Sequence, residues 1–116
     1  MRRNKMAISY SDFEKVDIRV GKVVEVTPYP KGKYSTHILK IDFGTEIGFK
    51  KSLARLSPNY QGPELVGKLV FGVVNFEPKQ IGEHISESLT LGVADENNNV
   101  VLVHPGKEVS LGGKMY

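Results

Sequence analysis

The sequence predicts a small all-β domain, and three observations support this fold class. Segments of strand length with alternating or continuous apolar residues recur along the chain, clusters of Gly, Pro and Asx residues separate them, and helix signals are short. The chain has 116 residues, of which 40% are hydrophobic and 25% are charged, an ordinary composition for a globular protein. We therefore expect residues 1–116 to form a single domain with one core.

The first strand is expected over residues 16–26, after one short helical turn. That turn is predicted because Ser11-Asp12-Phe13-Glu14 has the S-x-x-E form of a capping box. Within the strand the apolar positions change phase across Gly21, and Val23 is out of step, which predicts a glycine bend or bulge there. The prolines and the glycine of residues 27–34 predict a loop.

The rest of the chain continues in the same way. The second strand is expected over residues 38–43, with Leu39, Ile41 and Phe43 on one face. Further strands are expected over 47–53, 69–76, 89–94 and 100–103. The connections are expected to be a turn at 44–46, a short or broken helix within 59–66, a surface loop over 77–87, a hairpin turn at 95–99 and a turn at 112–113.

This order of elements is typical of an OB fold. Three strands, a short helical connection and further strands predict a five-stranded Greek-key barrel, with short helical segments and a C-terminal hairpin extension. An SH3-like barrel fits the same pattern.

Several classes of protein are disfavoured by composition. The chain has no cysteine, which excludes disulfides, thiolate metal sites and a cysteine nucleophile, and which fits a reducing cytoplasm. Polar residues such as Ser9 and Asp12 follow the basic start where a signal peptide would need an apolar stretch. No run approaches the roughly 18 apolar residues of a membrane span. We expect a soluble cytoplasmic protein without membrane insertion.

Sequence motifs give no support for catalysis. Residues 62–68 match the first seven positions of a phosphate-binding P-loop, but Leu69 replaces the required Ser or Thr, so we interpret the match as accidental. His37, His84 and His104 lie far apart and show no zinc-binding spacing. No serine-nucleophile motif is present. The sequence predicts no catalytic residue, no metal site, no cofactor and no enzyme activity.

Two features favour binding. The formal net charge is +3, and basic residues gather at Arg2-Arg3-Lys5, at Lys31 and Lys33, and at Lys50-Lys51 with Arg55. They could neutralise phosphates or form a solvated surface. Residues 75–81 combine an aromatic ring, amides and a lysine at what would be the rim of a barrel, where a binding site or an ordinary loop would fit equally.

Longer segments resemble a known family. Residues 12–22, Asp-Phe-Glu-Lys-Val-Asp-Ile-Arg-Val-Gly-Lys, resemble the opening signature of the tRNA-binding-domain family, an OB-fold group. The segments 41–44, 65–68 and 73–76 continue the resemblance in order and spacing. This resemblance favours the OB fold over an SH3-like barrel.

Within that family the chain is most similar to the CsaA-type secretion chaperones, through residues 41–52, 75–82 and 95–103. The resemblance implies a cytoplasmic homodimer that binds unfolded preproteins in a groove near the dimer interface, has the SecA export motor as a partner and needs no cofactor. From the subgroup match and the rim position we expect peptide contacts from Phe49, Ser52, Ala54, Asn75, Phe76, Lys79, Gln80 and Ile81.

The chain departs from the tRNA-binding branch at two motifs. Ala54-Arg55 stands where that branch has Ser-Gly, and Ser86-Glu87-Ser88-Leu89 stands where it has Ser-x-Gly-Met. These departures favour the chaperone interpretation. The alternative is a tRNA-binding protein that uses the basic face of the barrel, with nucleic-acid contacts from Arg19, Lys50, Lys51, Arg55 and Ser86.

Overall fold

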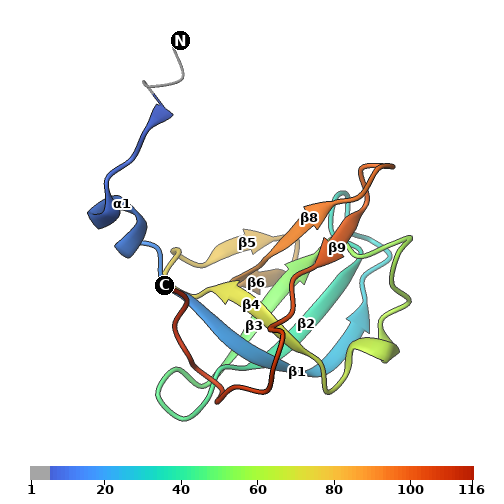
Figure 1. The fold of residues 1–116 in the computed structure, drawn as a ribbon. Coiled ribbons are helices and arrows are strands. Elements are labelled where there is room, and N and C mark those ends of the chain that lie inside the picture. Colours follow the sequence, from blue (N-terminus) through green and yellow to red (C-terminus); the bar gives the residue numbers. More distant parts are fainter. Residues whose placement is uncertain (1–5) are drawn as a thin grey trace.

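Five antiparallel strands form a nearly closed barrel in the computed structural model, which describes residues 6–116 (Figure 1). Their order in the sheet is β3-β2-β1-β4-β7. The strands are β1 (Ile18–Pro28), β2 (His37–Asp42), β3 (Phe49–Ala54), β4 (Leu69–Val73) and β7 (Leu89–Thr90). The all-β prediction and the OB-like barrel are confirmed.

Short strands and short helices within residues 6–116 complete the fold. α1 (Tyr10–Glu14) precedes β1, and the 3-10 helix η2 (Pro63–Leu65) lies between β3 and β4. β8 (Gly92–Ala94) and β9 (Val100–Leu102) form the expected C-terminal hairpin around the turn at 95–99.

The prediction of a loop over 77–87 is wrong. β5 (Lys79–Ile81) and β6 (His84–Ser86) form a second antiparallel hairpin there, in which Gln80 pairs with Ile85. The fourth strand accordingly ends at Val73 instead of residue 76. Gly82 makes the turn with φ of 62°, and strands of three residues are too short to show an alternating pattern.

The capping box lies two residues earlier than predicted. Ser9 is the N-cap of α1: its Oγ accepts the N–H of Asp12 at 3.1 Å, and the Asp12 carboxylate accepts the N–H of Ser9 at 3.1 Å. The bond from the N–H of Ser9, followed by hydrogen bonding to the Ser9 side chain, holds the pKa of Asp12 below its usual range. Ser11 therefore lies inside the helix. Asp12 makes the reciprocal side-chain bond to the N-cap N–H that the S-x-x-E pattern predicted for Glu14.

The irregularity of β1 lies beyond Gly21, contrary to the prediction. The pairing with β2 shifts between Val23 and Glu25, so Val24 is the bulged residue and Val23 is buried in the core. A Cβ at Gly21 would lie 2.5 Å from Ile41 Cγ2. Gly21 is thus required by packing, while the phase change in the sequence has a separate cause three residues later.

Phe43 lies at the centre of the barrel. It follows β2, and Leu39, Ile41 and Phe43 all point inward and are fully buried, as predicted. A Cβ at Gly72 of β4 would lie 2.9 Å from Phe43 Cζ, and one at Gly21 would lie 2.8 Å from the same ring. The two glycines leave the space that the large ring fills.

The seam between β3 and β7 is closed mainly through side chains. One backbone bond joins Glu87 N to the carbonyl of Lys51 at 2.8 Å. The Glu87 carboxylate accepts the N–H of Lys51 at 2.8 Å, and Ser86 Oγ accepts the N–H of Leu53 at 3.1 Å. Residues 86–87 therefore cover the polar edge of β3 that an open sheet would expose.

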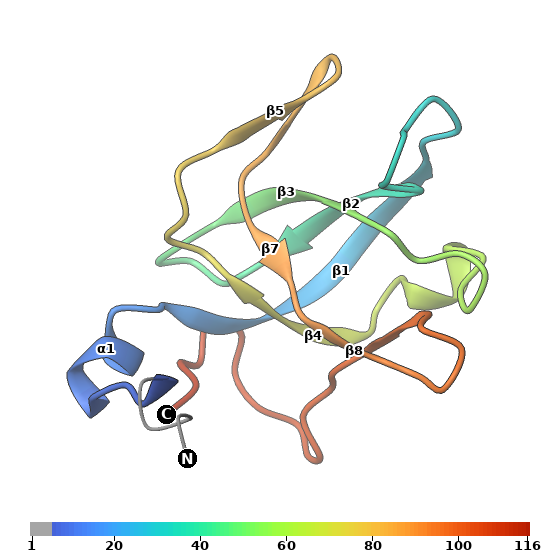
Figure 2. The ribbon, with the colours of Figure 1, turned by 90° about the horizontal axis from the view of Figure 1, so that it is seen from above.

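The C-terminal segment returns along the first strand. Val20 N donates to the carbonyl of Gly113 at 2.9 Å, and Met115 N donates to the carbonyl of Ile18 at 2.8 Å. The expected turn at 112–113 makes this return possible, with Gly112 at φ of 88°. The C-terminus consequently lies beside α1 in both views (Figures 1 and 2).

Candidate functional site

The hairpin β5–β6 stands away from the barrel (Figure 2). A cavity lies between the hairpin and the barrel, lined by residues of both. We call this cavity of about 600 Å³ the hairpin hollow. Its lining comes from β3, from the segment after β4, and from β5 to β7: Leu53, Phe76, Glu77, Lys79, Ile81, Ser86, Ser88 and Leu89.

The chemistry of the hairpin hollow is an apolar interior with charges in its lining. Leu53 points outward from β3 but is only 8% exposed, because β6 lies over it. Phe76 is 56% exposed and Leu89 is 47% exposed, so both present apolar surface to a ligand. Lys79 and Glu77 supply opposite charges. Such a site suits an apolar side chain whose neighbours are polar or charged.

Three of the residues predicted to bind peptide meet in this hollow: Phe76, Lys79 and Ile81. Gln80, which alternates with Lys79 and Ile81 along β5, donates from Nε2 to the carbonyl of Gly82 at 2.7 Å. Asn75 is also engaged within the chain, as described below. Neither amide lines the hollow.

The residues predicted from β3 do not join the hairpin hollow. Ser52 points into the barrel, where it is fully buried with its Oγ 2.7 Å from Thr90 Oγ1. Ala54 is half-buried against the core. Phe49 is exposed on the outside of the sheet, in a different cavity. The alternation of a strand separates these side chains, and the sequence resemblance does not give their direction.

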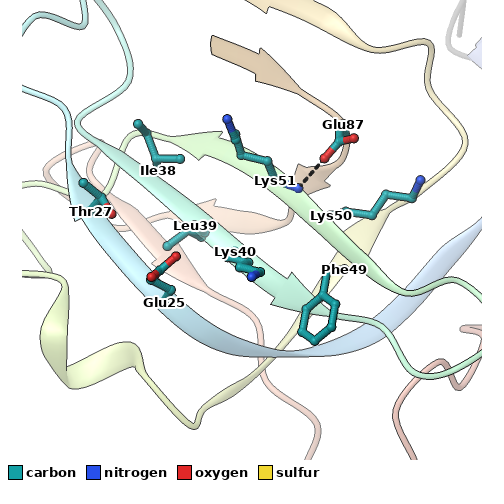
Figure 3. Close-up of a pocket in the computed structure, with 9 residues that line it drawn as sticks. All are labelled: Glu25, Thr27, Ile38, Leu39, Lys40, Phe49, Lys50, Lys51 and Glu87. Carbon is teal, nitrogen blue, oxygen red and sulfur yellow. Dashed lines mark hydrogen bonds between the residues drawn. The ribbon is translucent and has the colours of Figure 1, made fainter.

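A second cavity, of about 310 Å³, lies on the outer face of β1, β2 and β3 (Figure 3). We call it the strand-face hollow. Phe49 and Lys51 project outward from β3, and Lys40 Nζ lies 4.9 Å from the centroid of the Phe49 ring. Its lining residues are Glu25, Thr27, Ile38, Leu39, Lys40, Phe49, Lys50, Lys51 and Glu87.

Strand register arranges the charges of the strand-face hollow in one row. Glu25 pairs with Lys40, and Lys40 pairs with Lys51. Lys51 is in turn hydrogen-bonded to Glu87 through its backbone. The side chain of Lys50 extends away from Lys40 and Lys51 (Figure 3). Lys50 and Lys51 were predicted from the sequence, whereas Lys40 and Glu25 were not. Lys40 could have been recognised, because it alternates with the buried Leu39 and Ile41.

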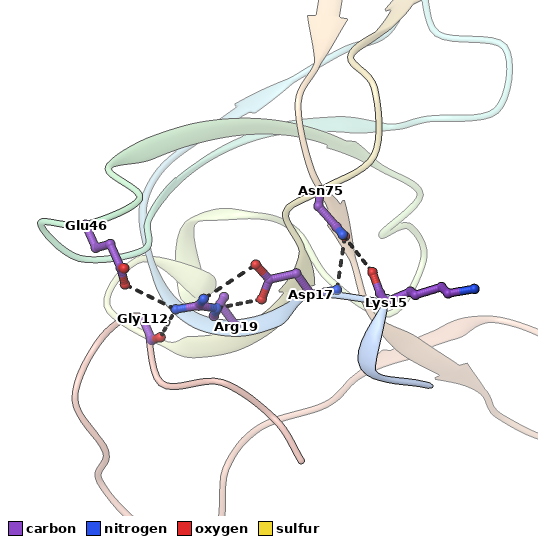
Figure 4. A network of polar contacts seen from close by, with 6 residues as sticks. All are labelled: Lys15, Asp17, Arg19, Glu46, Asn75 and Gly112. Atoms are coloured by element: carbon purple, nitrogen blue, oxygen red, sulfur yellow. Dashed lines mark hydrogen bonds and ion pairs between the residues drawn. The ribbon is translucent and has the colours of Figure 1, made fainter. Parts of the chain in front are cut away.

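Arg19, predicted to bind nucleic acid, is occupied by contacts within the chain (Figure 4). Its Nε donates to Asp17 Oδ1 at 2.6 Å, and its Nη1 donates to the carbonyl of Gly112 at 3.0 Å and to Glu46 Oε1 at 3.4 Å. The bond to Asp17 is the main reason why the pKa of Arg19 is raised above its usual value. Arg19 thus joins β1 to the C-terminal segment.

Asn75 makes a similar link in the same region (Figure 4). Its Oδ1 accepts the N–H of Asp17 at 3.0 Å, and its Nδ2 donates to the carbonyl of Lys15 at 2.8 Å. The side chain therefore holds the segment between α1 and β1 against the end of β4. The geometry of Asn75 supports this structural link and does not support the peptide contact that was predicted for its amide.

The other two residues predicted to bind nucleic acid lie apart from the strand-face hollow. Arg55 is exposed, and its Nη2 donates to the carbonyl of Asn98 at 3.3 Å. Ser86 Oγ accepts from Leu53 N and donates to the carbonyl of Ser88 at 3.2 Å, inside the seam. The predicted group at Arg2-Arg3-Lys5 lies outside the described residues.

The P-loop-like segment does not form a phosphate cradle. The N–H groups of Leu65, Gly67 and Lys68 donate to the carbonyls of Gly62, Val23 and Leu65. A P-loop needs such groups free to point at phosphate. Over residues 6–116, no three His, Cys, Asp or Glu side chains gather in a way that could hold a metal ion.

The comparisons with known proteins agree with this architecture. A family model described as a putative tRNA binding domain matches residues 18–114. The chain belongs to this family.

Within residues 6–116, no helix has the length and hydrophobicity that crossing a membrane requires.

Solved structures of whole CsaA chaperones are similar to the chain over nearly all its length. The CsaA chaperone of Picrophilus torridus is 42% identical, with a TM-score of 0.88, and the match covers 95% of this chain and 100% of that one. The CsaA chaperone of Bacillus anthracis is 35% identical, with a TM-score of 0.87 and coverage of 95% and 99%. The expected resemblance to CsaA-type members is confirmed.

Enzymes of translation contain a similar domain. The methionine–tRNA ligase of Pyrococcus horikoshii is 39% identical over 108 residues, which are 93% of this chain but 14% of the ligase. That of Nanoarchaeum equitans is 37% identical, and the match covers 13% of its length. The chain therefore spans only a small part of these ligases.

Proposed function

We propose that this protein is a binding protein without catalytic activity, which holds unfolded segments of preproteins in the hairpin hollow. The observation that carries the proposal is the hollow itself. It is about 600 Å³ in volume, has Phe76, Ile81 and Leu89 in its lining, and lies under a hairpin attached to a rigid barrel. The similarity to CsaA chaperones over the full length of those chains supports the same function.

The geometry suits weak, reversible capture of an extended chain. An apolar side chain of the client would pack between Phe76 and Leu89, and Lys79 would attract an acidic group or a C-terminal carboxylate. In the part of the chain that the structure describes, β5 pairs with β6 alone, so the outer edge of β5 can add a strand. Ordering an unfolded segment opposes binding, and micromolar affinity is therefore the expected scale.

The peptide proposal is tested by Phe76→Ala, with Phe49→Ala as the matched control because the two rings are 56% and 58% exposed. Losing the Phe76 contact should weaken binding of a fluorescently labelled unfolded preprotein segment about tenfold. The Phe49 variant should bind as the wild type does. Both variants should keep the wild-type melting temperature, since neither ring is in the core. Unchanged affinity of the Phe76 variant would remove the proposal.

Binding of tRNA is the second candidate, favoured by the family match and by the lysines on the outer face of the sheet. Phosphate contacts release counterions, so affinity for bulk tRNA should fall steeply between low and physiological salt. Lys40→Ala with Lys51→Ala should weaken binding and reduce the salt slope by about two. Lys107→Ala with Lys114→Ala is the control, at two exposed lysines outside this face. Salt-resistant tRNA binding without any peptide binding would overturn the chaperone proposal.

We also propose that the protein is a homodimer. Ile8 and Tyr10 are each 68% exposed near α1, and Tyr116 at the neighbouring C-terminus is exposed too. Apolar side chains gathered in this way commonly mark an interface. A cytoplasmic role in export, with the SecA motor as a partner, belongs to the same proposal and rests on the similarity to CsaA-type secretion chaperones.

A further inference from the structure

We propose that the strand-face hollow binds one unpaired nucleotide of single-stranded RNA, stacks its base on Phe49, and prefers bases that carry an amino group. This inference rests on the RNA-binding candidate function and deepens it, because it names the form of RNA and the bases that the site selects.

Phe49 provides the stacking platform. Its ring is 58% exposed at the start of β3, on the outer face of the sheet. Lys40 Nζ lies over its face, 4.9 Å from the ring centroid. A flexible ammonium group is easily displaced, whereas a packed side chain is not. A base that stacks on the ring would release Lys40 toward the phosphate that accompanies the base.

The row of charges beside Phe49 can contact both parts of a nucleotide. Across the sheet it runs Glu25, Lys40, Lys51 and Glu87, with the two cations between the two carboxylates. Adjacent strands are about 4.8 Å apart, so neighbouring charges of the row are about 5 Å apart and the whole row spans about 14 Å. The central lysines can hold phosphate, and the outer carboxylates lie where the edge of a stacked base could reach them.

These charges are available to a ligand. Within residues 6–116, no ion pair joins either carboxylate of the row to the lysines, which are Lys40, Lys50 and Lys51. Glu87 Oε1 accepts the N–H of Lys51 at 2.8 Å, which fixes the position of its carboxylate and leaves Oε2 for another donor. A site that had evolved only for polyanions would gain nothing from two carboxylates beside its lysines.

Carboxylates select bases by hydrogen-bond donors. An ionised carboxylate only accepts hydrogen bonds, so it can bind the amino groups of cytosine, adenine or guanine. Uracil offers its N3–H as the donor on this edge and has the O4 carbonyl, which a carboxylate repels, where cytosine has its amino group. The cavity of about 310 Å³ is at the small end of ligand sites, which suits a single planar base. In duplex RNA the faces of the bases are stacked on one another and cannot reach Phe49.

The test uses the full chain and fluorescence anisotropy with labelled octamers of cytidine and of uridine, a duplex of the same length, and bulk tRNA. We expect the cytidine octamer to bind about tenfold more tightly than the uridine octamer and the duplex. Phe49→Ala should weaken cytidine binding about tenfold. Tyr34→Ala is the matched control, because Tyr34 is also exposed and has Lys33 Nζ 5.6 Å from its ring centroid, but lies outside the hollow.

A double variant tests the carboxylates. Glu25→Gln with Glu87→Gln keeps the size of both side chains and an oxygen for the N–H of Lys51, so the seam should remain closed. Removing two negative charges should strengthen uridine binding and reduce the preference for cytidine to less than twofold. Glu46→Gln with Glu83→Gln removes two exposed charges elsewhere and should leave the preference unchanged.

The possible failures are distinguishable. If tRNA binds but Phe49→Ala binds the cytidine octamer as the wild type does, the inference is wrong and RNA binding stands. A preference for cytidine that survives in the glutamine variant, or equal binding of the duplex, also overturns it. If neither tRNA nor any octamer binds at low salt, the RNA-binding candidate fails together with the inference.

Discussion

The hydroxyl of Thr36 organises the connection between β3 and η2. Thr36 Oγ1 accepts the N–H of Leu56 at 2.8 Å and of Ser57 at 3.2 Å, which uses both of its lone pairs. The hydroxyl of Thr36 therefore donates its proton in a hydrogen bond to His37 Nδ1, 2.8 Å away. The imidazole proton is therefore assigned to Nε2, which donates to the carbonyl of Gln61 at 2.9 Å.

Thr36→Val should consequently destabilise the protein by about 2 kcal/mol, because it leaves two backbone N–H groups and one imidazole nitrogen without partners at a partly buried site. Thermal unfolding should show a decrease in melting temperature of about 8 °C. Thr36→Ser keeps the hydroxyl and should lose less than half as much. If the valine and serine variants melt together, the hydroxyl does not have this role.

Individual polar residues were the least predictable part of the candidate site. Ser52, Asn75 and Arg19 were expected to contact ligands, yet each binds another part of the chain. A hydroxyl, an amide or a guanidinium can serve either purpose. Ser52, Asn75 and Arg19 bind Thr90, Asp17 and Gly112, which are 38, 58 and 93 residues away, and Arg19 also binds Asp17 two residues away. Local sequence contains no information on partners that only the fold brings near.

At the scale of single elements, the β8–β9 turn is built around one carboxylate. Asp95 Oδ1 accepts the N–H of Asn97 at 2.8 Å and of Asn99 at 2.9 Å, and Oδ2 accepts from Asn59 Nδ2 at 3.0 Å. The bond from Asn59, and then those from the backbone, hold the pKa of Asp95 below its usual range. Asn98 adopts φ of 62°, as the predicted turn chemistry allows.

The lowered pKa of Asp95 makes the turn acid-sensitive. Its contribution to stability is complete above the unfolded-state value of 3.8 and is lost as the pH falls through the lower folded-state pKa. In a pH titration followed by amide NMR, the Asn97 and Asn99 signals should shift below pH ~4. Asp95→Asn should abolish this transition, whereas Glu96→Gln in the same turn should leave it. Shifts that persist in the Asp95 variant would assign them to another group.

The strands β1 to β4 were predictable because each is long enough to show its pattern, whereas β7 has two residues. Leu39, Ile41 and Phe43 alternate clearly, and glycines or Asx residues mark the turns. The β5–β6 hairpin was missed because each of its strands has three residues, and because the position of β6 depends on contacts with β3. That error mattered, since the hairpin forms one side of the hollow in which Phe76, Lys79 and Ile81 meet.

At the scale of the whole molecule, the exposed apolar residues beside α1 and the C-terminus predict self-association. The wild-type protein should sediment as a dimer at micromolar concentration. Ile8→Glu with Tyr10→Glu should give a folded monomer, because two carboxylates would have to be buried at the interface. Val93→Glu with Val109→Glu is the control at exposed apolar positions elsewhere. A wild-type protein that remains monomeric would refute the dimer.

The sequence by itself determined the fold class, the inward face of the second strand, the C-terminal hairpin and the family, because alternation, turn chemistry and motifs are local properties of the chain. Only the tertiary structure decided which side chains share a cavity. Strand register placed Glu25, Lys40 and Lys51 in one row, and the hairpin brought Ile81 into the same hollow as Leu89. Both arrangements depend on pairings between distant segments, and such pairings are set by packing of the whole barrel around Phe43.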